Sequence, residues 1–133
     1  MAVKHKTSLS AGELIREVLL DDPEVHSRVK KIFPVAVDEA KLPYILYRRA
    51  ALSVRPQKAG QPGADTLQIE VLCFTESYAE GVELAEAVRA ALDYKEAVNN
   101  AGDMRMRSCT LTDSEEAWQD DAFVQQMIFS VSI

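Results

Sequence analysis

Apolar residues recur at helical spacing near the start of the chain. The positions that share this spacing are Leu14, Ile15, Val18 and Leu19. Ser10 and Glu13 have the spacing of a capping box, in which each side chain satisfies a free backbone amide at a helix start. The pattern predicts a helix that begins at Ser10 and ends near residues 21–22. A second, short helix is predicted over 23–31, because this segment starts with a proline, which suits the first helical position.

A longer helix is predicted after Ser77, which forms a second capping box with Glu80. Its apolar stripe consists of Tyr78, Val82, Ala85, Val88 and Leu92. The stripe extends over about four turns. The helix is expected to end before residues 99–102, whose sequence Asn-Asn-Ala-Gly is typical of a turn.

Four segments have the features of β-strands. Residues 66–74 show the clearest alternation of apolar and polar positions. Residues 42–50 contain a proline that disfavours helix and are rich in tyrosine and isoleucine. Residues 104–112 alternate poorly, which a β-bulge near Ser108 would explain. Residues 123–133 form the last predicted strand.

The order helix, strand, strand, helix, strand, strand predicts an α+β fold. We expect one domain over residues 1–133, with two layers: a mainly antiparallel sheet of about four strands and two main helices packed on one face. Residues 1–8 are expected to be flexible, and 53–65, which contain prolines and glycines, to form a long mobile loop. The acidic stretch 113–121 is predicted to be a connection.

The outer face of the predicted sheet carries small or polar side chains. These belong to Gln68, Glu70, Gln126, Ser130 and Ser132. Such a face is either hydrated or covered by a neighbouring subunit, and the sequence leaves both alternatives open.

The composition restricts the classes of function. The formal net charge is −6, with 21 acidic and 15 basic residues, which argues against a general nucleic-acid binder because phosphate contacts need a positive surface. No stretch approaches the roughly 18 apolar residues that a membrane-spanning helix needs, and the start lacks the apolar core of a secretory signal. We therefore expect a cytoplasmic protein, with Cys73 and Cys109 as buried, reduced thiols.

The sequence shows no pattern of a catalytic, cofactor-binding or metal-binding site. It lacks a nucleophile with a matching base and a glycine-rich phosphate loop. Its histidines, His5 and His26, lie far apart and are expected to be solvated. The acidic residues of 115–121 lack the ligand register and the glycine of a calcium loop. We therefore expect no enzymatic activity, no cofactor and no bound metal.

Two features are candidates for contacts with other proteins. A basic cluster at the end of a predicted strand and in the following loop consists of Arg48, Arg49, Arg55 and Lys58. It either keeps an edge soluble or contacts the acidic surface of a partner, with DNA as a weaker alternative. Trp118, alone in an acidic stretch, either anchors an interface or folds back onto the core.

Four stretches, taken in order, carry a family resemblance over nearly the whole chain. They are GELIREVLLDDPEV, the pair IFP and LPYILYRR, LQIEVLCFTESYAEGVELAEAVRAALD, and DSEEAWQDDAFVQQMIFSVSI. In the most specific part, 67–93, a strand ending in an aromatic residue passes through Ser-Tyr-Ala-Glu into an alanine-rich helix. Together these stretches resemble the tail completion proteins of tailed bacteriophages and prophages.

The resemblance implies an α+β subunit whose copies form a ring, typically hexameric, at the end of the tail tube that faces the head. Such a ring stops tube growth and offers the surface on which the filled head docks. The implied partners are further copies of the chain, the tail-tube protein and head-connector proteins. The implied location is the host bacterial cytoplasm during assembly and the virion tail of an active phage. Residues 53–65 would then be an arm that orders on assembly, and strand edges would pair between neighbours.

Two other classes of function compete with this interpretation. A small-ligand-binding regulatory domain is one, because antiparallel sheets backed by two helices also host effector sites between subunits. An enzyme that recruits its reactive groups from a partner or cofactor is the other.

Overall fold

The computed structural model describes residues 7–29, 31–54 and 65–133. Its helices and strands follow the predicted order, with several short elements added. In chain order these are η1 (Ser8–Ser10), α1 (Ala11–Asp21), α2 (Pro23–Arg28), β1 (Lys31–Pro34), β2 (Tyr44–Val54), β3 (Asp65–Thr75), α3 (Tyr78–Leu92), β4 (Ala97–Val98), β5 (Arg105–Met106), β6 (Ser108–Gln119) and β7 (Ala122–Ser132).

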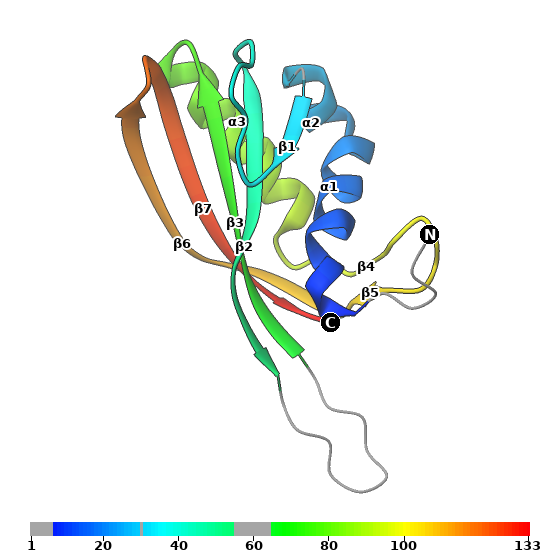
Figure 1. Ribbon diagram of the computed structural model, residues 1–133. Helices are drawn as coiled ribbons and strands as arrows, with labels where there is room; N and C mark the ends of the chain where they lie inside the picture. Colours follow the sequence, from blue (N-terminus) through cyan, green and yellow to red (C-terminus); the bar gives the residue numbers. More distant parts are fainter. Residues whose placement is uncertain (1–6, 30, 55–64) are drawn as a thin grey trace, which may run out of the picture.

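Five of the strands form one mixed sheet in the order β1-β2-β3-β7-β6, and β4 pairs with β5 beside it. β1 runs parallel to β2, whereas the other neighbours in the large sheet are antiparallel. The α-helices pack on one face of this sheet (Figure 1). The α+β class is confirmed, but the prediction of about four mainly antiparallel strands omitted β1. That strand has four residues and ends in proline, so it is too short to reveal an alternation.

The core lies between this face of the sheet and the helices. The apolar positions of β3 that the alternation singled out are all fully buried: Leu67, Ile69, Val71 and Cys73. β7 adds Met127, Phe129 and Val131 beside them, and α1 covers them with Leu14, Ile15 and Leu19. Each large apolar side chain buried in this way contributes about 1.5–3 kcal/mol. The alternation in the sequence therefore identified the inward face of the central strands correctly.

The helix α3 is rotated relative to the predicted stripe. Its buried residues are Gly81, Leu84, Val88, Ala91 and Leu92, whereas Tyr78 is 49% exposed. Gly81 packs closely on the sheet, since a Cβ atom there would lie 2.9 Å from Oγ1 of Thr75. The stripe drawn through Tyr78 is wrong at this end of the helix, because a glycine adds no apolar signal to a sequence pattern even where it packs most tightly.

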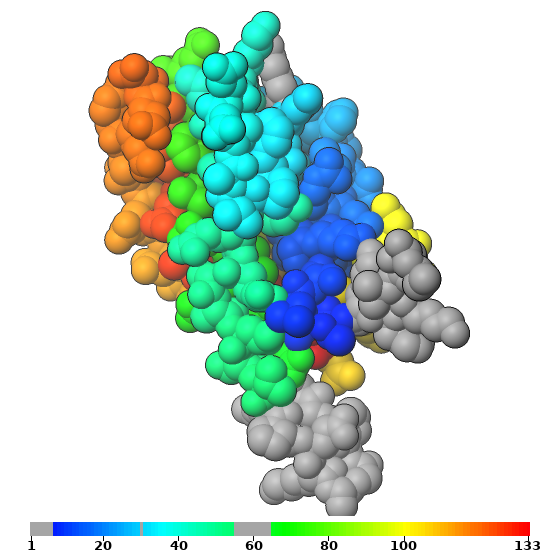
Figure 2. Space-filling model, in the orientation of Figure 1, coloured from blue at the N-terminus to red at the C-terminus, as the bar shows by residue number. Residues whose placement is uncertain are grey.

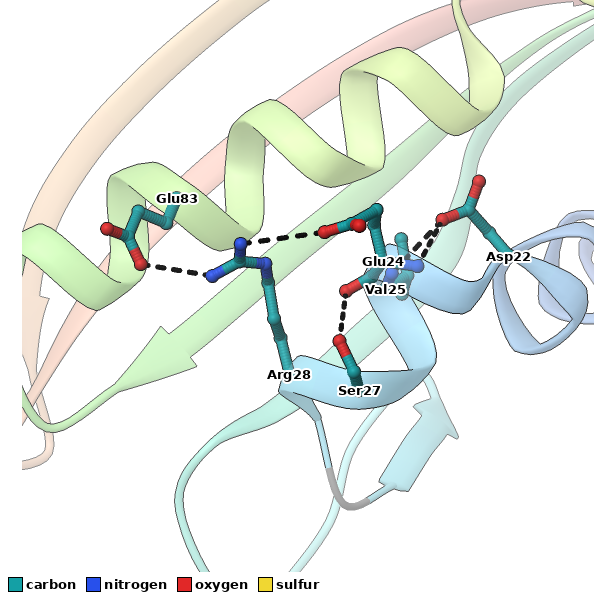
Figure 3. A network of polar contacts seen from close by, with 6 residues as sticks. All are labelled: Asp22, Glu24, Val25, Ser27, Arg28 and Glu83. Carbon is teal, nitrogen blue, oxygen red and sulfur yellow. Dashed lines mark hydrogen bonds and ion pairs between the residues drawn. The ribbon is translucent and has the colours of Figure 1, made fainter.

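The short helix α2 is fixed at both ends by polar contacts (Figure 3). The Asp22 carboxylate accepts hydrogen bonds from the backbone amides of Glu24, at 3.0 Å, and Val25, at 3.1 Å, which caps the helix start. At the other end, Arg28 forms ion pairs with Glu83 of α3, at 3.0 Å, and with Glu24, at 3.6 Å. Exposed pairs of this kind contribute about 0–1 kcal/mol each, so the pair with Glu83 orients α2 on α3 rather than holding the fold together.

The N-terminal capping contact differs from the predicted one. Ser10 precedes α1 but makes no side-chain capping bond, and Thr7 instead accepts a hydrogen bond from the Leu9 amide at the start of η1. Ser8, within the stretch that was expected to be flexible, is buried and its hydroxyl donates to the carboxylate of Asp65. The first six residues lie outside the described part of the chain.

The acidic stretch 113–121 is not a connection. Strand β6 continues through it to Gln119, and only Asp120 and Asp121 form the turn into β7, with φ values of 52° and 58°. Aspartate tolerates this left-handed conformation better than most residues, which suits a two-residue hairpin turn. The segment shows no alternation because both of its faces are exposed at the edge of the sheet.

Two further boundaries are shifted. The strand predicted over 104–112 is divided between β5 and β6, and its register shift falls between Leu111 and Asp113 rather than near Ser108. The predicted loop 53–65 is shorter, because β2 extends to Val54 and β3 begins at Asp65. The remainder of that loop lies outside the described residues.

Candidate assembly surfaces

The outer face of the sheet carries a polar network across its three central strands. Arg48 of β2 donates from Nε to Glu70 of β3 at 3.0 Å, and Gln126 of β7 donates from Nε2 to the other oxygen of Glu70 at 2.7 Å. The Glu70 side chain is only 10% exposed, whereas that of Arg48 is 48% exposed. Arg48 therefore neutralises a largely covered carboxylate within its own subunit.

Arg49 lies on the opposite face of the sheet from Arg48. It is the register partner of Ile69 on the helix-covered face, and its guanidinium donates to the carbonyl of Leu9 at 3.2 Å. Arg55 and Lys58 lie outside the described residues. The two described members of the predicted basic cluster are thus separated by the sheet and do not form one patch.

Three aromatic side chains gather where β6 turns into β7, on the face that carries the helices. Trp118 meets its register partner Phe123 edge to face, with ring centroids 4.8 Å apart, and Phe123 meets Tyr78 of α3 in the same way at 6.1 Å. We call these three residues the aromatic cluster. Trp118 remains 59% exposed and Tyr78 49%. Trp118 thus packs against Phe123 but is not buried in the core.

Polar side chains fix the position of the aromatic cluster. Glu116 Oε2 accepts a hydrogen bond from the Tyr78 hydroxyl at 2.8 Å and another from Gln125 Nε2 at 2.9 Å. The bonds from Gln125 and then Tyr78 lower the pKa of Glu116, and the same contact with Glu116 raises the pKa of Tyr78. Glu116 is therefore charged and Tyr78 neutral over the whole physiological range.

This end of the molecule is strongly acidic. Residues 113–121 contain five aspartates and glutamates and no lysine or arginine, and the first turn of α3 adds Glu80. In Figure 2 this hairpin forms the orange tip at the upper left of the molecule. The tip repels phosphate groups and favours contact with a basic surface.

The edge of the sheet at β6 is covered near the start of the strand. There the Tyr94 amide donates to the Cys109 carbonyl at 2.6 Å, and the Leu111 amide donates to the Asp93 carboxylate at 2.9 Å. Beyond the register shift, no other strand or loop of the described chain pairs with the outward side of 113–119. We call this segment the open edge.

The described surface offers little that a small molecule or metal would need. A hollow of about 250 Å³ beside β1 is shallow and is lined by Lys31, Phe33, Glu39, Ala40 and Lys41. Among the described residues, no group of three or more histidines, cysteines or acidic residues is arranged to hold a metal ion. Both cysteines are buried, and burial raises the pKa of Cys109 to about 12, so its thiol stays protonated at neutral pH.

Trp118 was predicted to lie in a connection, and the sequence did not reveal that Phe123, Tyr78 and Glu116 form a cluster with it. The signal that could have revealed the aromatic cluster is the hairpin turn at Asp120 and Asp121, which places Trp118 opposite Phe123.

No helix in the described part of the chain is long and apolar enough to cross a membrane.

The comparisons with known proteins agree with this architecture. A chain from the structure titled "Virion of native gene transfer agent (GTA) particle" has a similar fold, with a TM-score of 0.70 and 16% identity over 95% of this chain and 98% of that chain. No curated protein matches the sequence. The family model for tail completion protein gp17 matches residues 13–133. This chain therefore belongs to the phage tail completion protein gp17 family, a family of structural phage proteins.

Proposed function

We propose that this protein is a tail terminator subunit that acts by assembly and has no catalytic activity. Copies of the chain form a ring, hexameric by the family resemblance, that caps the tail tube and joins it to the head. Its partners are the tail-tube protein and head-connector proteins. The family match over residues 13–133 is the observation that carries the proposal.

The character of the described surface supports a protein partner. Trp118 and Tyr78 are more than 45% exposed yet held in fixed positions by Phe123 and Glu116. Exposed aromatic side chains with little freedom left to lose are typical anchors of protein interfaces. We therefore propose Trp118, rather than the pair Arg48 and Arg49, as the leading contact residue for assembly.

The ligand-binding alternative receives no comparable support. The hollow beside β1 has a volume of about 250 Å³, below the roughly 300–1,000 Å³ of typical ligand pockets, and the larger hollows of about 380 and 530 Å³ are flatter. Drug-sized ligands need a concave site that covers most of their surface.

The mass of the purified protein, measured by light scattering across a concentration series, tests ring formation. The chain should give a ring-sized species, either alone or after addition of a phage tail-tube protein. A monomer or dimer whose mass does not change with concentration or on addition of the tube protein would contradict the proposal and favour the ligand-binding alternative.

A further inference from the structure

We infer that the open edge, residues 113–119 of β6, binds an extended basic segment of a different protein as an added strand. The inference deepens the proposed function by naming the chemistry of one partner. The first support is geometric, because the strand ends the sheet and no described strand or loop pairs with its outward side. An unpaired strand edge is a ready template for main-chain hydrogen bonds with another chain.

The side chains of the open edge specify the charge of the added strand. Asp113 and Glu115 lie on the outer face, since their register partners are Ile128 and Gln126. Trp118 lies on the other face, opposite Phe123. Because side chains alternate along a strand, the best occupant has lysine or arginine at every second position, beside the two carboxylates. Its other face carries apolar residues that reach Trp118.

The sheet edges of a second copy of this chain are poor occupants of the open edge. Pairing β6 with β6 of another copy would bring two identical acidic segments together, which repel each other. The other edge of the sheet, β1, is blocked: Pro34 has no amide proton, its carbonyl accepts from Ala36 at 2.6 Å, and the Ile32 carbonyl accepts from Arg16 at 3.4 Å. The acidic charge thus disfavours pairing between two β6 strands and favours a basic segment as the occupant.

A synthetic seven-residue peptide of alternating lysine and valine tests the inference on the full chain. Trp118 is the only tryptophan, so its fluorescence reports binding at the open edge without a label. Amide hydrogen exchange by NMR should show protection of amides within 113–119 that increases at least tenfold on binding. The same peptide with every internal backbone amide N-methylated keeps its charge but has no internal amide left to donate to β6, and it should bind at least tenfold more weakly.

A matched pair of variants separates this edge from general attraction between opposite charges. The exposed side chain of Glu115 makes no hydrogen bond or ion pair in the described structure, and Glu115→Lys should weaken peptide binding about fivefold or more. Glu86→Lys, an equal charge change on the exposed face of α3, should alter it less than about twofold.

The inference would be overturned by no binding of the peptide, by equal binding of its methylated form, or by protection that falls outside 113–119. It would also be overturned if the chain self-associates and Glu115→Lys changes that self-association, because a second copy would then be the occupant. Ring formation is measured on the chain without the peptide, so failure of this inference and failure of the terminator proposal are distinguishable.

Discussion

Gly81 of α3 lies so close to Thr75 of β3 that a Cβ atom on the glycine would sit 2.9 Å from the threonine Oγ1. The Thr75 hydroxyl cannot easily move away, because it donates a hydrogen bond to the carbonyl of Ser77 at 2.7 Å. The start of α3, and with it Tyr78, is therefore positioned by a close contact between helix and sheet.

Gly81→Ala should lower the free energy of unfolding by about 1–3 kcal/mol. The gain in helix propensity, about 1 kcal/mol, is smaller than the strain of the contact with Thr75. Urea denaturation measures the change, with Glu86→Ala on the exposed face of α3 as the control, expected within about 0.5 kcal/mol. In a Thr75→Ala background the cost of Gly81→Ala should fall, and an unchanged cost would show that the contact is not the cause.

Val71→Asp should abolish folded, soluble protein. Val71 is fully buried in the central strand between Tyr47 and Met127. A carboxylate at this position would be buried without a hydrogen-bond or ion-pair partner, which is strongly destabilising. Gln68→Asp in the same strand is the matched control, because Gln68 is exposed on the outer face and should tolerate the change. A normal thermal unfolding curve for Val71→Asp would contradict the observed strand register.

Arg48→Ala should destabilise the fold more than Arg49→Ala. Arg48 neutralises the covered carboxylate of Glu70, whereas Arg49 makes an exposed bond to a backbone carbonyl. Because Arg48 is half exposed, we expect about 1 kcal/mol for Arg48→Ala and less for Arg49→Ala, measured by urea denaturation. The double variant Arg48→Ala/Glu70→Gln should recover part of the loss; equal effects of the two arginines would contradict the network.

The contact between Glu116 and Tyr78 predicts that the fold loses some stability in acid, when Glu116 is protonated, and in alkali, when Tyr78 is deprotonated. The lowered pKa of Glu116 stabilises the fold above the ordinary glutamate pKa of about 4.3, and this contribution is lost as pH falls through the pKa in the folded state. The raised pKa of Tyr78 gives stability below about pH 10 that is lost as pH rises through its folded value.

NMR titration of the Glu116 carboxyl checks this prediction. Its midpoint should lie below that of an ordinary glutamate and should rise in Gln125→Leu and, to a smaller extent, in Tyr78→Phe, following the order of the two hydrogen bonds. Both side chains are exposed to solvent, so the effect on global stability is small. A midpoint that neither variant moves would mean that the hydrogen bonds are absent in solution.

The sequence was sufficient for the parts of the fold that depend on periodic burial. Strand β3 is buried on its helix-covered face and polar near its exposed end, so its two-residue period was visible. Edge strand β6 has no such period, because residues beyond Leu111 are exposed on both faces, and its acidic composition resembles a loop. Strand β1 is too short to show any period.

The candidate site was harder to predict because it depends on register. Arg48 and Arg49 are adjacent in sequence, yet the alternation of the strand sends them to opposite faces, which composition cannot show. Trp118 was singled out as a lone tryptophan, but its contacts with Phe123 and, through Phe123, with Tyr78 arise only when the hairpin and α3 meet. Clusters formed by distant elements leave no local signal in the chain.

Electron microscopy of growing tail tubes tests the central claim most directly. A phage tail-tube protein is polymerised with and without the purified protein, and tube length and tube ends are recorded. We predict that the protein shortens the tubes and adds a ring of density at one end, and that Trp118→Ala weakens both effects. Tubes of unchanged length with bare ends would contradict the assignment as a tail terminator.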